Sequence, residues 1–410
     1  MRRILALDWL TGPRIVLYGG LICAINALIL VFGILFTGQT PHRVDFIAFQ
    51  AAGRLALAGE AAAAYDWERL RDVQAAILGI APEGMTGYLG WLNPPHFFFA
   101  VLPFAPLAYA WAWAGWILAC VVLLGLAARG IMPGAAALVA VFCTPSVLLS
   151  LGVGQNGALV AALMAWTLLL LDRRPALAGV ALGLLTIKPQ FGLVFPLLLA
   201  LTGRWRVFAA ASATVAAVAA ASWIAFGGET WRAFLPMVAG TADRYLAPGS
   251  EVLPKIQSVH AFVMQATGQA ALAWALHGAV AALALAVVLR LWLRRPEGPE
   301  EARAAAAIAA AFLLTPYAWT YDTPVIAIAA LFLARAARRE GWLPGEKALL
   351  VLAPAALLVV VFRPFSLVGP LAWVLILGLA WRRDAAWRRA AAPGAPALSP
   401  VPRGSMSAGT

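Results

Sequence analysis

The sequence predicts an all-α integral membrane protein, a polytopic bundle of about twelve transmembrane helices. Its 410 residues are 63% hydrophobic and 12% charged, with a mean hydropathy of +0.85. An ordinary soluble domain is closer to half apolar and a quarter charged. The formal net charge of +12 comes mainly from arginines that stand in short clusters between apolar runs, as they do in the cytoplasmic loops of membrane proteins. This pattern argues against nucleic acid as a partner.

Taken in order along the chain, the apolar runs define the candidate spans. The first, 15–36, is longer than the hydrophobic region of a signal peptide and has no small-residue cleavage site after it, so we expect an uncleaved span. The run 96–128 is too long for one straight span, and Pro103 and Pro106 predict a short re-entrant or broken helix that leads into a full one. The other candidate spans are 133–150, 156–171, 175–187, 189–202, 205–226, 270–293, 303–316, 320–336, 347–361 and 366–381.

The arginine clusters set the predicted orientation. They lie at 129, 172–174, 204–206, 290–303, 334–340 and 381–389, and they alternate with loops that are poor in Lys and Arg. Placing these clusters in the cytoplasm puts both termini inside and fits a bacterial inner membrane. The motifs of chemical interest then share the outer side, at 44–46, 91–96, 152–157, 187–190, 255–260, 315–322 and 362–365. We expect a transmembrane domain over 1–381 and a disordered cytoplasmic tail over 382–410.

Asp45 is the acidic residue that follows the first span. The next stretch, 46–57, has apolar residues interleaved with Gln50 and Arg54. This pattern predicts a helix that lies in the outer membrane interface, with Asp45 near its N-terminus, where a carboxylate is favoured. Two interpretations are open: Asp45 is an ordinary helix cap, or it is a general base at the membrane surface.

Two cations stand among apolar residues on the same side. Lys188 lies where the short runs 175–187 and 189–202 meet at a proline, an arrangement typical of helices that end around a cavity at membrane depth. Its ammonium is costly there unless it reaches the interface or a partner. It either extends to the lipid headgroups or binds a phosphate as a point charge. Arg363, in "FRPF", either anchors the headgroup region or binds a phosphate in bidentate fashion.

Polar side chains in three other outer motifs are candidate ligands for a sugar. Gln155 and Asn156 lie in the turn "GVGQNG", where amides either cap the next helix or hydrogen-bond sugar hydroxyls. Gln257 and Ser258 precede a predicted span, and Asp322 is a second outer acidic group that is either a helix cap or part of the site. The four histidines have no helical i, i+4 pairing and the outer loop has no Asp-x-Asp pair, so we expect no metal and no cofactor.

Taken in order, these motifs resemble the membrane glycosyltransferases of family 87. The resemblance covers about residues 14–380 and rests on "VDFIAFQAAGRLALAGEAAAAYD", "NPPHFFFAVLPFAPLA", "GQNGALVAALMAWTLLLLDRRPALAGVALGLLTIKPQFGLVFPLLL", "QSVHAFV" and "LLTPYAWTYD". The family is similar to the polyprenol-phosphate-mannose-dependent mannosyltransferases of mycobacterial envelope glycolipids. The resemblance implies the GT-C fold, a polyprenyl-phosphate-sugar donor and a reaction on the outer face of the membrane.

The resemblance also assigns residues. It carries the family's catalytic Asp onto Asp45, its Gly-Gln-x-Asn-like turn onto Gln155 and Asn156, its Lys-Pro element onto Lys188, and its Gln-Ser element onto Gln257 and Ser258. The chain departs from the family at Tyr321 and Asp322, where the family commonly has His. The implied reaction is metal-independent sugar transfer with inversion at the anomeric carbon.

In this reaction Asp45 takes the proton of the acceptor hydroxyl, and Lys188 and Arg363 stabilise the departing lipid phosphate. The acceptor is a glycolipid or a glycan. A flippase or permease without catalytic chemistry is the alternative from another class; such transporters often show matched broken helices and polar residues at the midplane. A transferase of the same fold with another lipid-linked donor is also open.

Overall fold

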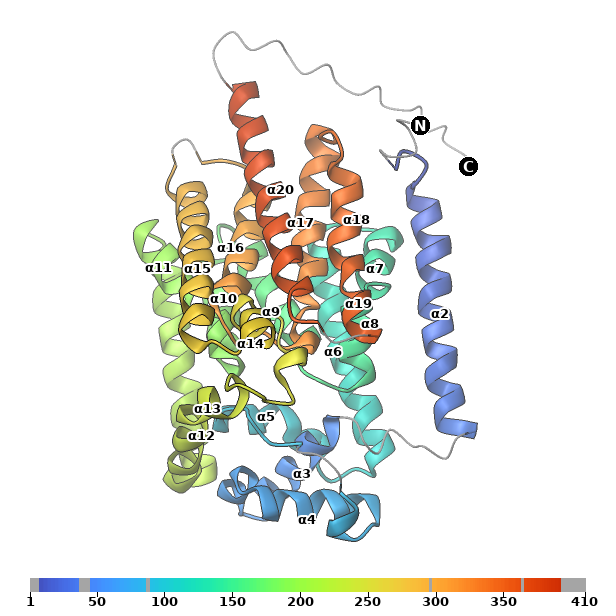
Figure 1. Ribbon diagram of the computed structural model, residues 1–410, viewed down its shortest axis with the longest axis vertical. Helices are drawn as coiled ribbons and strands as arrows, with labels where there is room; N and C mark the ends of the chain where they lie inside the picture. The colour runs from blue at the N-terminus through green and yellow to red at the C-terminus, as the bar shows by residue number, and fades with distance from the viewer. Residues whose placement is uncertain (1–6, 37–44, 86–88, 295–296, 363–364, 392–410) are drawn as a thin grey trace.

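The computed structural model describes residues 7–36, 45–85, 89–294, 297–362 and 365–391. Within these ranges the secondary structure is helical, and the extended pairing consists of one isolated antiparallel bridge between Ile256 and Trp319. Long helices run along the vertical axis of Figure 1, and a lobe of shorter helices lies across their lower end. The predicted all-α class is therefore confirmed for the described part of the chain.

Four helical stretches of the described residues are long and apolar enough to cross a bilayer. They are α6 (Tyr109–Ile131), α12 (Trp205–Ala239), α15 (Ala270–Leu293) and the stretch Thr320–Glu340, which contains η8 (Thr320–Asp322) and α17 (Val325–Glu340). A fifth results if α7 (Ala135–Phe142) and α8 (Pro145–Gly152), which are bent by 66°, form one span. The chain therefore has the spans of a membrane protein, while the number of about twelve crossings stays a prediction.

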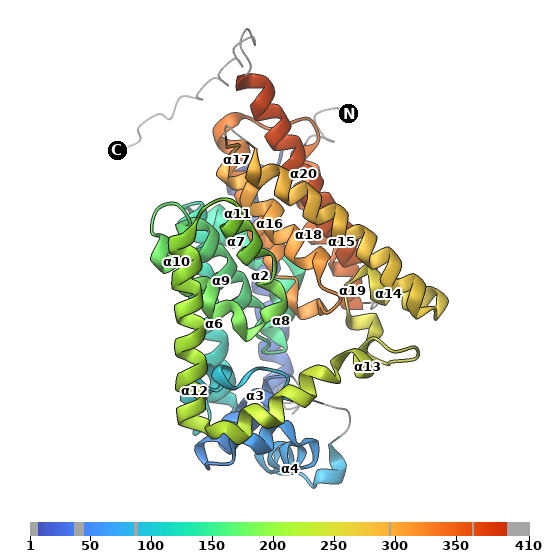
Figure 2. The ribbon, with the colours of Figure 1, turned by 90° about the vertical axis from the view of Figure 1, so that its left-hand side faces the viewer.

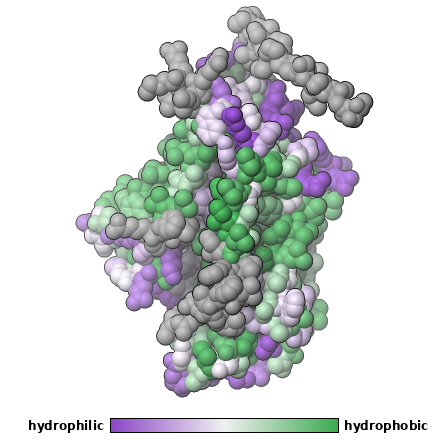
Figure 3. All heavy atoms as spheres, turned by 90° about the vertical axis from the view of Figure 1, so that its right-hand side faces the viewer, coloured by the Kyte–Doolittle hydropathy of each residue, from purple (hydrophilic) through white to green (hydrophobic). Residues whose placement is uncertain are grey.

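The outer surface of the bundle is hydrophobic, as a surface that faces lipid must be. Large apolar side chains point outward from α6, α12 and α15, among them Leu118 at 63%, Ile224 at 83% and Leu283 at 66% exposure. Figure 3 shows hydrophobic residues over the middle of the face that carries α2 (Gly12–Phe36), with hydrophilic residues gathered mainly above and below them.

Several of the predicted spans are helices shorter than a bilayer requires. They are α9 (Gly157–Leu170), α10 (Pro175–Leu184) and α11 (Val194–Leu201). Between α10 and α11 the chain passes through two 3-10 turns, η5 (Leu185–Ile187) and η6 (Pro189–Phe191), with Lys188 between them. The predicted break at Lys188 is therefore present, because Pro189 cannot donate the hydrogen bond that would continue α10. The cavity predicted around it stays a prediction.

The centre of the bundle is α16 (Glu300–Leu314), in which every residue from Glu301 to Leu313 is buried. It packs against α15, α17 and α20 (Val368–Ala391). Its run of alanines allows these neighbours to approach closely, as small residues do in lipid.

The remaining elements are short or lie at the ends of the bundle. They are η1 (Ala61–Tyr65), α4 (Trp67–Leu78), η2 (Pro82–Gly84), η3 (Pro95–Phe97), α5 (Phe98–Val101), η4 (Leu102–Phe104), α13 (Thr241–Tyr245), η7 (Leu253–Lys255), α14 (Val259–Thr267), α18 (Glu346–Ala356) and α19 (Leu358–Phe362). The η3, α5 and η4 turns are the short broken helix predicted before α6.

The lower lobe is built around α3 (Phe46–Leu57), whose bounds are those predicted. Its residues from Phe46 to Gly53 are buried, and it packs against α4, η1, η4 and α5. Protein therefore covers most of this helix. Its place in a membrane interface stays a prediction.

Helix α12 changes direction at Gly227, whose backbone has φ 79° and ψ 160°. A residue with a side chain rarely adopts this conformation. Figure 2 shows α12 descending along the bundle and then turning across the lower end toward α13 and α14. Beyond the turn, the loop before α14 pairs with the segment before α17 through the bridge between Ile256 and Trp319.

The predicted boundary of the C-terminal tail is wrong. Helix α20 continues to Ala391, and Arg383 within it is buried and bonded to Glu346 on α18. A buried ion pair holds residues 382–391 in the folded protein, so no disordered tail begins at 382. Residues 392–410 lie outside the described residues.

Candidate active site

Asp45 stands at the start of α3 without capping it. Its backbone is helical, and its carboxylate makes no hydrogen bond to the first amides of the helix. Instead, Gln155 Nε2 donates to Asp45 Oδ2 at 3.0 Å, across 110 residues of sequence. The helix-cap interpretation of Asp45 is therefore wrong, because the carboxylate is directed to another part of the chain.

Two glycines of the "GVGQNG" turn allow this contact. Gly154 has φ 70°, and a Cβ there would lie 2.6 Å from the Cβ of Phe46. A Cβ on Gly157 would lie 1.9 Å from the carbonyl oxygen of Tyr321. The turn thus packs between the start of α3 and the start of α17 in a space that only glycine fits. The Phe46 amide also donates to Val153 O at 3.2 Å.

A chain of amides orients Gln155. The Asn156 backbone amide donates to Gln155 Oε1 at 3.4 Å, and Asn156 Nδ2 donates to Asn93 Oδ1 at 3.1 Å. Asn156 is fully buried and Asn93 nearly so. Because Gln155 Oε1 accepts a bond, its Nε2 is the atom left to donate to Asp45. The sequence analysis did not select Asn93, although the motif at 91–96 contains it.

Lys188 and Asp322 form an ion pair in the interior. Lys188 Nζ lies 2.5 Å from Asp322 Oδ1, with the two side chains 10% and 0% exposed. Asp322 Oδ2 accepts from the Trp319 amide at 3.1 Å, and the Lys188 ammonium also lies 4.7 Å from the centroid of the Tyr321 ring. Asp322 thus both caps η8 and neutralises Lys188, which avoids the cost of an isolated buried charge.

The ionisation of Asp45 depends on Gln155 and on the two lysines Lys188 and Lys255. Burial raises the pKa of the Asp45 carboxyl above its ordinary value of 3.8, and the bond from Gln155 and the charges of Lys255 and Lys188 act in the opposite direction. Asp45, Gln155, Asn156, Lys188, Asp322 and Lys255 are together called the Asp45 site below. A partly buried carboxylate with a raised pKa is a stronger base than one in water.

Gln257 and Ser258 have structural partners. The Gln257 amide donates to Ala318 O at 2.6 Å, and its Oε1 accepts from the Gly369 amide at 3.0 Å. Ser258 Oγ accepts from the Ala261 amide at 3.1 Å and caps α14. The two side chains are 0% and 2% exposed. They hold the 255–258 loop against the start of α17, and their contact with a sugar stays a prediction.

Arg363 lies outside the described residues. In the described part of the chain, no group of three or more His, Cys, Asp or Glu side chains is arranged to hold a metal ion.

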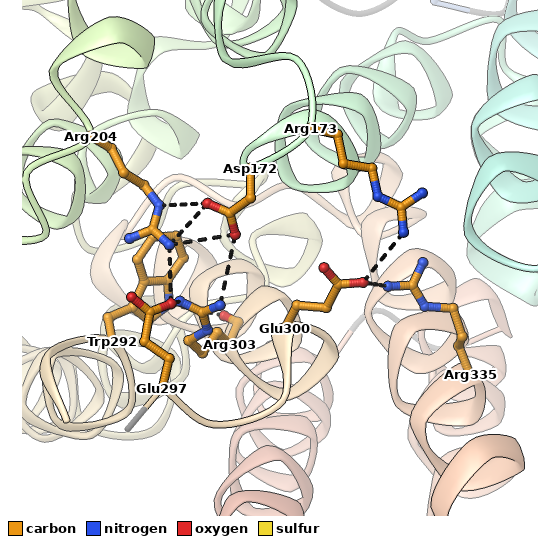
Figure 4. Close-up of polar contacts among 8 residues, drawn as sticks. All are labelled: Asp172, Arg173, Arg204, Trp292, Glu297, Glu300, Arg303 and Arg335. Atoms are coloured by element: carbon orange, nitrogen blue, oxygen red, sulfur yellow. Dashed lines mark hydrogen bonds and ion pairs between the residues drawn. The ribbon is translucent and has the colours of Figure 1, made fainter. Parts of the chain in front are cut away.

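The opposite end of the bundle carries the arginine clusters. Figure 4 shows Asp172 between Arg204 and Arg303, Glu297 beside both arginines, and Glu300 beside Arg173 and Arg335. This group, with Glu301 and Arg339, is called the arginine-rich end. The first turn of α2 and the last turn of α20 lie at the same end in Figure 1, whereas α3 and α4 lie at the other. The segregation of arginine clusters from the chemical motifs is thus present in three dimensions.

A sequence model of glycosyltransferase family 87 matches residues 91–316, which is more than half of the chain. The matched stretch contains Asn93, Gln155, Asn156, Lys188 and Lys255; Asp45 precedes it and Asp322 follows it. No curated protein and no solved structure matches the chain.

Proposed function

The chain belongs to glycosyltransferase family 87 and is a membrane glycosyltransferase, and from this premise we propose that it uses a polyprenyl-phosphate sugar as donor. The sugar is a hexose, mannose in first place, and the acceptor is a glycolipid or a glycan. The reaction takes place at the outer face of the inner membrane, at the end of the bundle opposite the arginine-rich end. Asp45 is the general base.

The contact between Asp45 and Gln155 carries this proposal. A carboxylate that only capped a helix would bond to the amides of its own first turn, as Asp66 does with Glu68 and Arg69. Asp45 instead accepts from a side chain that a buried amide network orients. Such a network holds a base in one direction, which general base catalysis requires.

The proposed chemistry is a single displacement. The acceptor oxygen attacks the anomeric carbon, its proton moves to Asp45, and the bond from the anomeric carbon to the phosphate oxygen breaks. The electron pair of that bond stays on the lipid phosphate, which leaves. One base and one displacement invert the anomeric centre. Lys188 and Arg363 are the predicted cations for the leaving phosphate; Lys188 reaches it when the bond to Asp322 opens.

The test is transfer of labelled sugar by the purified protein in detergent, from a panel of polyprenyl-phosphate hexoses that includes mannose, to a membrane glycolipid extract. Asp45→Asn keeps the shape and the bond to Gln155 but cannot take a proton. We expect it to lower the transfer rate by about 10²–10⁴-fold. Asp66→Asn is the matched control, because it changes an acidic residue of the same lobe that does cap a helix.

The melting temperature of Asp45→Asn shows whether a loss of activity comes from lost chemistry or from unfolding. The pKa of Asp45 is raised in the folded protein, so the folded state binds this proton more tightly than the unfolded state does. The contribution of Asp45 to the free energy of unfolding is therefore lost as the pH rises through the folded pKa. Asp45→Asn is therefore expected to melt no lower than wild type at pH 7. Equal transfer by both proteins would remove Asp45 as the base, and no transfer by wild type from any donor would overturn the donor class.

A further inference from the structure

The three lysines stand out among the 30 basic residues of the chain, since all the others are arginines. Lys347 lies near the ring of Trp342, 5.6 Å from its centroid, on α18. Lys188 and Lys255 belong to the Asp45 site. A lysine carries a compact charge on a flexible stem, whereas arginine presents a planar fork that suits fixed carboxylate partners.

The main chain at Lys255 is held in place on the segment that carries Asp322. Lys255 ends η7, and its carbonyl accepts from Thr320 Oγ1 at 2.8 Å. The next residue, Ile256, pairs with Trp319, and Ser366 Oγ donates to Leu253 O at 2.8 Å on the other side. These bonds fix the main chain from which the Lys255 side chain extends, and that side chain is exposed.

No described carboxylate neutralises the charge of Lys255, whereas Lys188 and Arg232 each contact one. Asp322 neutralises Lys188, Arg54 donates to Ala105 O and Leu107 O, and Arg232 contacts Glu229. The described residues offer Lys255 no salt bridge. Its ammonium is close enough to Asp45 to act on the ionisation of that carboxylate.

We propose that Lys255 binds the phosphate of the lipid-linked sugar donor, beside the base Asp45. This inference rests on the proposed function. The ligand is a phosphodiester, with one negative charge, that joins a sugar to a lipid. As the bond to the anomeric carbon breaks, the phosphate becomes a monoester with about two negative charges. An unpaired ammonium therefore stabilises the transition state more than the bound donor.

The test compares Lys255→Ala and Lys255→Arg with wild type, and Lys347→Ala is the matched control at the opposite end. Kinetics are measured at a pH well above the acidic limb of the rate profile, because removing Lys255 also raises the pKa of Asp45. We expect kcat/KM for the donor to fall about 10- to 100-fold in Lys255→Ala, with kcat falling as well as KM rising. Lys255→Arg keeps the charge and retains most of the activity. Melting temperatures stay unchanged, since the side chain is exposed.

Inhibition identifies the source of the phosphate. Polyprenyl monophosphate is expected to inhibit wild type and Lys347→Ala equally, and to inhibit Lys255→Ala at least about 10-fold more weakly. Inorganic phosphate and vesicles of an anionic phospholipid are expected to inhibit all three proteins equally and weakly. Stronger inhibition of wild type by either of these would assign Lys255 to free phosphate or to headgroups instead and overturn the proposal.

The two proposals fail separately. Active wild type with Lys255→Ala indistinguishable from Lys347→Ala overturns the role of Lys255 and leaves the proposed function standing. If wild type transfers no sugar from any donor, the proposed function fails. Direct binding of fluorescent polyprenyl phosphate then decides the inference, since equal affinity of wild type and Lys255→Ala overturns it.

Discussion

At the arginine-rich end each described guanidinium of the network contacts a carboxylate, whereas at the Asp45 site the catalytic candidate contacts an amide and one lysine faces solvent. Glu301, 2% exposed, is held by both Arg335 and Arg339 at 2.9 Å. The carboxylate of Asp45 instead accepts a hydrogen bond from Gln155 Nε2. The first arrangement neutralises charge and fixes helices; the second leaves a carboxylate able to accept a proton and an ammonium able to bind an anion.

Substitution of Arg383 is expected to have the largest effect on stability and to test the contrast between the two ends. It lies at the same end of the bundle as the arginine network, contacts Glu346 through two guanidinium nitrogens, and donates to Gly341 O at 2.9 Å. The two side chains are 2% and 0% exposed. Arg383→Ala leaves Glu346 buried without a cation, so we expect a loss of about 3–5 kcal/mol in the free energy of unfolding.

The measurement is unfolding in detergent, followed by helical circular dichroism, with sugar transfer assayed on the folded fraction. Exposed Arg206 is the control, and Arg206→Ala should leave the unfolding curve unchanged. A lower kcat in folded Arg383→Ala would mean that this end takes part in catalysis, which would undo the contrast between the two ends.

Lys188→Ala is expected to have the next largest effect. It leaves Asp322 buried without its ammonium, at a cost of about 3 kcal/mol in the free energy of unfolding. Adding Asp322→Asn removes the uncompensated charge, so the double variant should be more stable than Lys188→Ala alone, and a double-mutant cycle measures the coupling. A Lys188→Ala variant as stable as wild type would show that the pair is open in solution and that Lys188 is available to a ligand.

Gln155→Leu is expected to have the smallest effect of the three variants, and it tests whether Asp45 is the group that titrates. The bond from Gln155 lowers the pKa of Asp45, so its loss raises that pKa further. Since Asp45 must be ionised to act as a base, the activity lost on acidification is then lost at higher pH. A hydrogen bond to a charged group contributes about 1.5–3 kcal/mol, so we expect the acidic limb of kcat/KM to move up by about 1–2 pH units. An unmoved limb would mean that another group titrates.

The sequence correctly predicted the features that depend on residues close together in the chain. The bounds of α3, the break at Lys188 and the short broken helix before α6 follow from hydropathy and proline, which act within a few residues. The tail prediction failed at 382–391 because Arg383, which reads as a solvated charge in sequence, has a buried partner on α18.

The sequence predicted which residues belong to the site better than it predicted what each of them does. Asp45, Lys188 and Asp322 were all selected. The sequence left a cap or a site role open for the two aspartates, and a headgroup or a phosphate contact open for Lys188. The structure adds contacts across long sequence separations that the sequence did not predict: Asp45 with Gln155 and Lys188 with Asp322, the latter 134 residues apart. Asn93 and Lys255 were missed. One signal for Lys255 was present, since it is one of three lysines in an arginine-rich chain.

The sequence by itself determined that this protein is a helical membrane protein, that its arginines gather apart from its chemical motifs, and to which family it is similar, because composition, hydropathy and motif order are properties of the linear chain. Only the tertiary structure decided which carboxylate is neutralised and which is available. That distinction depends on whether a partner lies within about 4 Å, and residues more than a hundred positions apart meet at such distances only after the helices have packed.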